Sequence, residues 1–327
     1  MAQTLTLPAA RGLLLGLLLG DAVGSANGRV AAAGSLPAGT GGQLACWTME
    51  GLIRSHVRGV QRGVTDPVAM LLSGYARWAA VRGERPGPVD GWLAGVPALA
   101  QRRGAGLAAL APSPATGGPD AYALIPALPI GLCDWWPGLA RQIAAGMRSG
   151  PAVGAAGLAA ELVGALARGE ALDAAVRTAS LAAAPGQAGS GQAGLGQAGS
   201  GTADVDLARA VALARTGNGE PDIIRGLAPR PSAVNALTGG VYAAATAGEP
   251  GGIRAALLLA ASTQDGGHTA TVTGALLGLM HGPDRLPLDW LGRLELVWPG
   301  DTLARDLVRQ ADERPADGPW WERYPGA

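Results

Sequence analysis

Apolar residues that recur every three to four positions dominate this sequence. Within residues 157–167, for example, Leu158, Leu162 and Leu166 follow one another at intervals of four. That interval is close to the 3.6-residue turn of an α-helix, so the three side chains share one helix face. Alternating runs of valine, isoleucine and aromatic residues, which are typical of strands, do not occur. The sequence therefore predicts an almost entirely α-helical fold.

Comparable patterns predict further helices, and turns rich in glycine and proline separate them. The predicted helices cover residues 11–23, 43–60, 67–82, 137–147, 157–167, 172–184, 205–215, 233–247, 252–262, 270–280 and 288–296. The predicted turns cover residues 83–87, 112–120, 226–231 and 248–251.

One segment differs from the rest. Residues 185–201 read PGQAGSGQAGLGQAGSG, an imperfect Gly-Gln-Ala-Gly repeat. Such a tract loses much entropy on ordering and has little apolar surface to bury, so we predict a flexible surface loop. The helical segments on both sides share the same composition. We therefore expect a single domain over residues 1–327, with residues 185–201 as an insertion.

Charge and cysteine content exclude several classes of protein. Lysine plus arginine and aspartate plus glutamate each number 25, so the formal net charge is zero. That balance argues against a protein that binds nucleic acid or a membrane surface by electrostatics. Cys46 and Cys133 are too few for a disulfide scaffold and are expected to be buried thiols. A reducing, cytoplasmic location is expected.

The apolar run at residues 13–20 is the nearest approach to a membrane signal. It is much shorter than the roughly 20 residues that a membrane span needs, and Asp21 follows it directly. A secretory signal, with Arg11 as its basic flank and small residues at 22–26, is the alternative. The poor placement of Arg11 and the acidic end of the run argue against it. We expect no membrane association.

Three segments carry recognisable motifs. They are RGLLLGLLLGDAVGSANG at residues 11–28, GTGGQLACWTMEGLIR at residues 39–54, and ALLLAASTQDGGHTATVTGALLGLMHGPDRLPLDW at residues 256–290. In their order and separation they resemble the ADP-ribosylglycohydrolase family, and the resemblance covers nearly the whole chain. It implies a compact orthogonal bundle of many helices around a central cleft. It also implies that two magnesium ions in the cleft assist the release of ADP-ribose from a modified side chain.

The metal-binding motifs of that family are incomplete in this sequence. The family's Thr-Asp-Asp-Thr run falls on Gly39, Thr40, Gly41 and Gly42, so both of its carboxylates are replaced. In the later Asp-x-Asp-Thr run, Asp265 is kept, whereas Gly267 and His268 stand at the last two positions. Further departures from the family pattern fall at Gly28, at Pro126 and in residues 147–151.

These losses bear on the metal and on the reaction. Two magnesium ions close together need several carboxylates to offset their charge. We therefore expect no cofactor, and magnesium only if the family site survives. The sequence favours a pseudo-hydrolase, expected to be monomeric, that binds ADP-ribose or a related nucleotide or serves as a scaffold for a protein partner. The alternatives are an active hydrolase with a rearranged site around Asp265, His268 and Asp21, and an unrelated helical interaction protein.

The candidate site residues each allow two interpretations. In the functional interpretation, Asp265 and His268 form a residual site for one metal ion or an acid–base pair. In the structural interpretation, which we favour, Asp265 caps a helix and His268 lies in its first turn. Thr40 either donates its hydroxyl to a substrate or belongs to a turn. Asp21 interrupts an apolar helix beside the expected cleft, so it either contacts substrate or, as we favour, braces a loop through hydrogen bonds.

Other chemically capable residues are assigned to structure. A zinc site from Asp265, His268 and Cys46 is disfavoured because Cys46 shares an apolar stripe with its neighbours. His56 is expected to be solvated, and His281 to end a helix, where an imidazole suits the negative end of the dipole. The tryptophan pairs at residues 135–136 and 320–321 are expected to pack internally rather than stack on a nucleotide.

Overall fold

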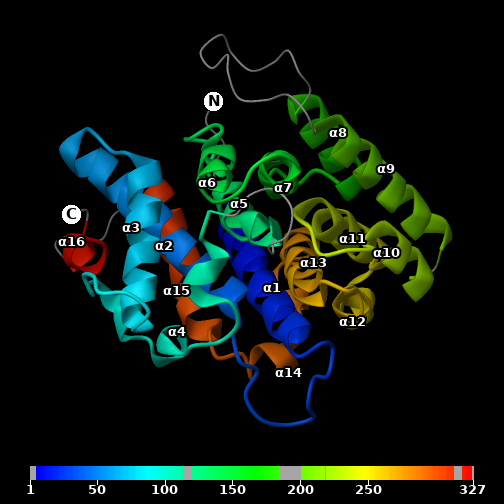
Figure 1. Cartoon of the computed structure of the whole chain (residues 1–327), viewed down its shortest axis with the longest axis horizontal. Coiled ribbons are helices and arrows are strands. Elements are labelled where there is room, and N and C mark those ends of the chain that lie inside the picture. The colour runs from blue at the N-terminus through cyan, green and yellow to red at the C-terminus, as the bar shows by residue number, and fades with distance from the viewer. Residues whose placement is uncertain (1–4, 113–119, 184–199, 218, 313–318, 326–327) are drawn as a thin grey trace.

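The computed structural model describes residues 5–112, 120–183, 200–217, 219–312 and 319–325. Within these ranges the regular elements are all α- or 3₁₀-helices, and the single β-bridge pairs Leu36 with Leu294 in parallel (Figure 1). The predicted all-α class is confirmed. Residues 185–199 of the predicted loop lie outside the described residues, and residues 200–201 already belong to a helix.

The α-helices are α1 (Leu7–Ser25), α2 (Thr40–Arg62), α3 (Pro67–Val81), α4 (Pro97–Ala100), α5 (Leu124–Ile130), α6 (Leu139–Met147), α7 (Pro151–Ala167), α8 (Leu172–Ala183), α9 (Ser200–Thr216), α10 (Pro221–Leu227), α11 (Ala233–Thr246), α12 (Ile253–Ala261), α13 (Gly266–His281), α14 (Leu288–Leu291), α15 (Val297–Ala311) and α16 (Pro319–Arg323). The 3₁₀-helices are η1 (Trp92–Gly95), η2 (Gly106–Ala109), η3 (Asp120–Ala123), η4 (Pro250–Gly252) and η5 (Pro283–Arg285).

The largest error in the predicted helices lies near the C-terminus. A continuous helix over residues 288–296 was expected, but α14 ends at Leu291 and the chain then turns. After this turn Leu294 pairs with Leu36 in the β-bridge. The N–H of Leu36 donates to Arg293 O (2.7 Å), and the N–H of Glu295 donates to Leu36 O (3.1 Å). This pairing joins residues far apart in sequence, so a helical period could not reveal it. The following helix, α15, was not predicted.

Helix α1 forms the centre of the molecule (Figure 1). Every residue from Gly12 to Gly24 in it is buried, which fits a helix that is apolar on nearly all sides. Its length and mean hydropathy of 1.4 match those of a membrane span, and it is the one such helix among the described residues. Because 83% of its apolar window is buried within the protein, α1 packs as a core helix does.

Helices α1 and α13 touch through their backbones. Gly12, Gly16 and Gly20 of α1 face Gly278, Gly274 and Ala270 of α13, and a Cβ on any of the three α1 glycines would overlap a carbonyl oxygen of α13. Spacing of four keeps these glycines on one helix face. The two helices run antiparallel, so the last turn of α1 lies beside the first turn of α13. This contact brings Asp21 close to the segment that carries His268.

Candidate ligand-binding cleft

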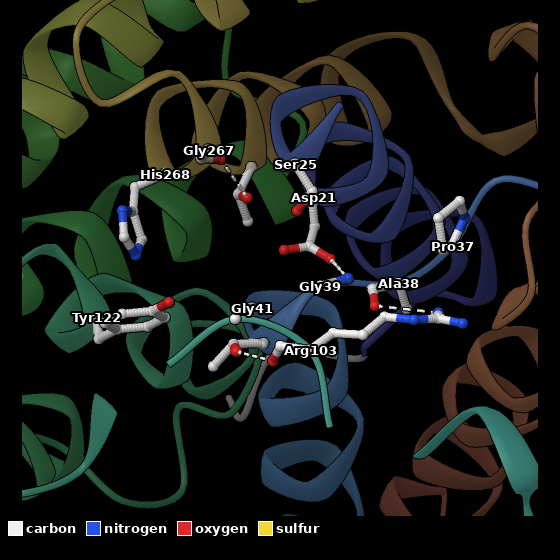
Figure 2. Close-up of a pocket in the computed structure, with 13 residues that line it drawn as sticks. Asp21, Ser25, Pro37, Ala38, Gly39, Gly41, Arg103, Tyr122, Gly267 and His268 are labelled. Carbon is white, nitrogen blue, oxygen red and sulfur yellow. Dashed lines mark hydrogen bonds between the residues drawn. The ribbon is translucent and has the colours of Figure 1, made fainter. Parts of the chain in front are cut away.

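A cavity of about 420 Å³ opens where the end of α1 meets the beginnings of α2 and α13 (Figure 2). That volume lies in the range of about 300–1,000 Å³ typical of small-molecule sites. Four glycines, at positions 39, 41, 104 and 267, form part of the wall. The hydroxyl, carboxyl and imidazole side chains that line it are Asp21, Ser25, Thr40, Tyr122, His268 and Thr271. Three of the predicted site residues, Asp21, Thr40 and His268, therefore share one cavity.

Asp21 caps helix α2 from a neighbouring helix. Gly39, the N-cap residue of α2, has no side chain to satisfy the free amides of the first turn. Its N–H instead donates to Oδ2 of Asp21 at 2.6 Å, and the amides of Gly41 and Gly42 lie close enough to lower the pKa of this carboxylate. Only 4% of Asp21 is exposed. The carboxylate therefore braces the start of α2, as the structural interpretation expected, and also lines the cavity.

Burial has the largest effect on the pKa of Asp21. It raises the pKa of the carboxyl from 3.8 to about 6, while the amides of Gly39, Gly42 and Gly41 and the nearby His268 lower it in part. Because the pKa is higher in the folded than in the unfolded chain, protonation of Asp21 favours folding. This contribution is fully present below about pH 3.8 and is lost as the pH rises through about 6.

Asp21→Asn removes this titration, so the stability of the variant should respond differently to pH. A shift of about two pKa units corresponds to about 3 kcal/mol, and most of it falls between about pH 4 and pH 8. Over that range we expect the wild type to lose about 2 kcal/mol of unfolding free energy relative to the variant. Urea unfolding of both proteins at both pH values measures this difference. A difference that stays constant with pH would contradict the account.

Thr40 forms hydrogen bonds with the segment of residues 103–106 beside the cavity. Its Oγ1 donates to Arg103 O at 2.7 Å and accepts from the N–H of Gly106 at 3.4 Å. The Arg103 side chain in turn pairs with Glu295, with Nη2 and Oε1 3.2 Å apart. The hydroxyl group of Thr40 therefore already donates its proton to a backbone carbonyl. The predicted contact of Thr40 with substrate stays a prediction.

Asp265 and His268 form a hydrogen-bonded pair at the start of α13. Oδ1 of Asp265 lies 2.6 Å from Nδ1 of His268, and the two side chains are 15% and 12% exposed. Asp265 occupies the N-cap position, as expected, but its side chain makes no capping bond to the backbone. The favoured interpretation as an ordinary cap is therefore wrong for the side chain. Oδ2 of Asp265 is buried and has no hydrogen-bond partner among the described residues.

Tyr122 was missed by the sequence analysis. Its ring meets that of His268 edge to face, with centroids 4.3 Å apart and planes at 90°. Asp120, two residues earlier in η3, accepts from the N–H of Ala233 at 2.7 Å, and burial raises its pKa. Both residues lie at the end of, or just after, the predicted turn at 112–120. No spacing motif marks them, because their role depends on a contact with α13 and α11.

Several other candidates lie away from the cavity. Cys46 is buried in the core, and neither tryptophan pair lines the cavity. His56 is half-buried rather than solvated, because its ring packs 4.8 Å from that of Trp135 and Nδ1 lies 2.8 Å from Nε2 of Gln310. His281 ends α13, as predicted.

Comparison with known proteins identifies the family. The sequence profile described as ADP-ribosylglycohydrolase matches residues 3–317. The chain belongs to the ADP-ribosylglycohydrolase family. A solved structure described as an ADP-ribosylglycohydrolase-related protein complex has the same fold, with a TM-score of 0.58 and 21% identity over 93% of this chain and 98% of that chain. A search of curated proteins gave no match.

The carboxylates near the cavity are engaged in hydrogen bonds within the protein. Within the described ranges, no three histidine, cysteine, aspartate or glutamate side chains lie close enough to share a metal ion. Asp21 accepts a hydrogen bond from the N–H of Gly39, and Asp265 is hydrogen-bonded to His268. A magnesium pair needs several free carboxylate oxygens.

Steric contacts with Asp21 explain the glycines at the start of α2 in this family member. A Cβ on Gly41 would lie 2.7 Å from Oδ1 of Asp21, and one on Gly42 would lie 2.8 Å from Oδ2. Both distances are shorter than real Cβ contacts allow. The resemblance places the family's second aspartate at position 41, and that side chain would meet Asp21 here. The glycines therefore leave room for the Asp21 carboxylate.

Proposed function

We propose that this ADP-ribosylglycohydrolase family member is a pseudo-hydrolase that binds ADP-ribose or a related nucleotide without a metal pair. The observation that carries the proposal is the position of the Asp21 carboxylate at the start of α2. This carboxylate accepts a hydrogen bond from the N–H of Gly39 at the start of α2, where the resemblance implies metal ligands, and it also lines the cavity. A binding site without the family's metal chemistry is the function that this combination supports best.

The lining suits a nucleotide with a sugar. Glycine walls let a ligand approach the backbone closely, and Tyr122 offers an aromatic surface opposite them. Serine, threonine and histidine side chains supply hydrogen bonds to hydroxyl groups. These features give affinity and orientation, while the hydrogen bonds already made by Asp21 and Asp265 leave few free carboxylate oxygens to hold a magnesium pair. Release of ADP-ribose should therefore be absent with or without magnesium or manganese.

A rearranged active site is the second candidate, and the hydrogen bond between Asp265 and His268 favours it. A carboxylate that holds Nδ1 of an imidazole can leave Nε2 free to accept a proton from water. In that case modified protein should lose ADP-ribose slowly without metal, and Asp265→Ala should abolish the release. A scaffold role in a protein complex, as the description of the similar solved structure suggests, is compatible with either candidate.

Calorimetry with ADP-ribose in the presence of a chelator tests the proposed function. We expect saturable binding, and Tyr122→Ala should weaken it about tenfold, since an aromatic contact is worth about 0.5–1.5 kcal/mol. Trp298→Ala is the control, because Trp298 is an exposed aromatic residue on α15 that does not line the cavity. No heat with ADP-ribose, or equal effects of the two substitutions, would refute the proposal.

A further inference from the structure

The last described helix, α16, lies at the edge of the molecule (Figure 1). Trp320 and Tyr324 in this helix are buried and belong to the hydrophobic core. The hydroxyl of Tyr324 donates to Oδ2 of Asp306 on α15 at 2.5 Å. Just beyond the helix, Pro325 O accepts from Nη1 of Arg54 on α2 at 2.8 Å. These contacts hold the C-terminal helix against α2 and α15.

Gln310 of α15 links α16 to α2 through hydrogen bonds. The indole Nε1–H of Trp320 donates to Oε1 of Gln310 at 2.6 Å. An indole can only donate, so this contact fixes which end of the Gln310 side chain is the oxygen. The amide nitrogen of Gln310 therefore points toward α2, where it lies 2.8 Å from Nδ1 of His56. Only 1% of Gln310 is exposed, so water has little access to either contact.

This order of donors and acceptors requires a neutral His56. The amide nitrogen of Gln310 donates, so Nδ1 of His56 accepts and carries no proton. The proton of the neutral ring is then on Nε2. A protonated imidazole would instead turn a second donor toward the amide nitrogen. The only acceptor that Gln310 could offer to the new proton is Oε1, which already binds Trp320.

The charged groups around His56 are balanced in sign. Its ring packs 4.8 Å from that of Trp135 and 6.4 Å from that of Trp136, in the segment between α5 and α6. The described charged residues nearest in sequence to the contacts of His56, Gln310 and Trp320 are Arg54, Arg58, Asp134, Asp306, Arg309, Asp312, Glu322 and Arg323. They comprise as many acidic as basic side chains. The hydrogen bonds of Gln310 are therefore the feature that distinguishes the neutral from the protonated ring.

We propose that docking of α16 is pH-sensitive: the helix is held while His56 is neutral and is released more often once His56 takes up a proton. A charged donor binds an oxygen more strongly than a neutral one, so the protonated ring draws Oε1 of Gln310 away from the indole of Trp320. An ordinary histidine takes up this proton near about pH 6.5. Because Tyr324 stays bound to Asp306, protonation raises the released fraction without freeing the helix entirely. The device is independent of the proposed function, since none of these residues lines the cavity.

Exchange of the Trp320 indole proton with solvent, followed by NMR, measures the release of α16. The chain has nine tryptophans, so Trp320→Phe assigns the signal. Relative to free tryptophan, exchange in the wild type should rise about tenfold between about pH 7.5 and about pH 5.5, the effect of about one hydrogen bond. The indole proton of Trp78 is the internal control. It also binds a buried glutamine oxygen, that of Gln43 at 3.0 Å, but the nitrogen of this glutamine donates to backbone carbonyls and not to a histidine. Unchanged exchange at Trp320, or an equal rise at Trp78, would overturn the proposal.

Two substitutions separate protonation of His56 from a general effect of pH. His56→Asn offers Gln310 an amide oxygen that does not titrate, so the rise in exchange should disappear. Gln310→Glu should reverse the response, because a carboxylate accepts from both Trp320 and the protonated ring, and exchange should then slow as the pH falls. His281→Asn, at the end of α13, should behave as the wild type does. A rise of wild-type size in His56→Asn or in Gln310→Glu would overturn the proposal, and His56→Asn decides alone if Gln310→Glu does not fold.

Discussion

Glu50→Gln should lower the unfolding free energy by about 3–5 kcal/mol, the usual cost of removing one partner from a buried ion pair. Glu50 is fully buried in α2 and binds two arginines. Its Oε1 accepts from Nε of Arg54 at 2.6 Å, and its Oε2 accepts from Nη2 of Arg77 at 2.7 Å. Both arginines are also buried, and Asp90, the other carboxylate that pairs with them, is 40% exposed. Glutamine would leave two buried cations with one partly exposed counter-ion.

Glu161→Gln is the matched control. Glu161 lies within α7 and is exposed, so the same change there should alter the unfolding free energy by no more than about 0.5 kcal/mol. Chemical denaturation of the three proteins gives both values. If both variants lose the same small amount of unfolding free energy, the ion pairs of Glu50 with its two arginines stabilise the fold less than their burial and geometry imply.

Gly278→Ala should cost about 3 kcal/mol and should also disturb the cavity. A Cβ at this position would overlap the carbonyl oxygen of Gly12 and lie 2.5 Å from its carbonyl carbon. Backbone atoms cannot move aside as a side-chain tip can, so α1 and α13 would have to separate. Because the same contact positions Asp21 beside His268, affinity for ADP-ribose should fall together with stability.

Gly146→Ala provides the comparison for Gly278. Gly146 is an exposed glycine in α6, and a Cβ there would meet no atom within 4 Å. Alanine should therefore stabilise the helix by up to about 1 kcal/mol. Thermal unfolding of both variants measures the contrast. A Gly278→Ala protein as stable as the wild type would mean that the close approach of the two helices is not required.

The helical period revealed most long helices because each buries one apolar face. Leu158, Leu162 and Leu166 lie in α7 as predicted, although the helix begins earlier, at Pro151. α15 was missed although Leu303 and Leu307 in it keep the helical spacing and are buried. Its early Pro299 and Gly300 resemble a turn, and only packing against α1 and α2 makes the helix necessary.

The site was predictable only in part, for a physical reason. Asp21 stood out because a carboxylate within an apolar helix requires a buried partner. The partner amides of α2 and the role of the glycines there depend on how α1 and α2 meet, which no local pattern encodes. Tyr122 gave no signal at all, since a single tyrosine after a turn is common and its contact with His268 is long-range.

Magnesium titration by calorimetry tests the central claim most directly: the hydrogen bonds of Asp21 and Asp265 leave this cleft without a site for paired metal ions. The protein is first freed of metal with a chelator, which is then removed. The account predicts no saturable binding at micromolar magnesium and no metal requirement for ADP-ribose. Two magnesium ions bound per chain with micromolar affinity would contradict it.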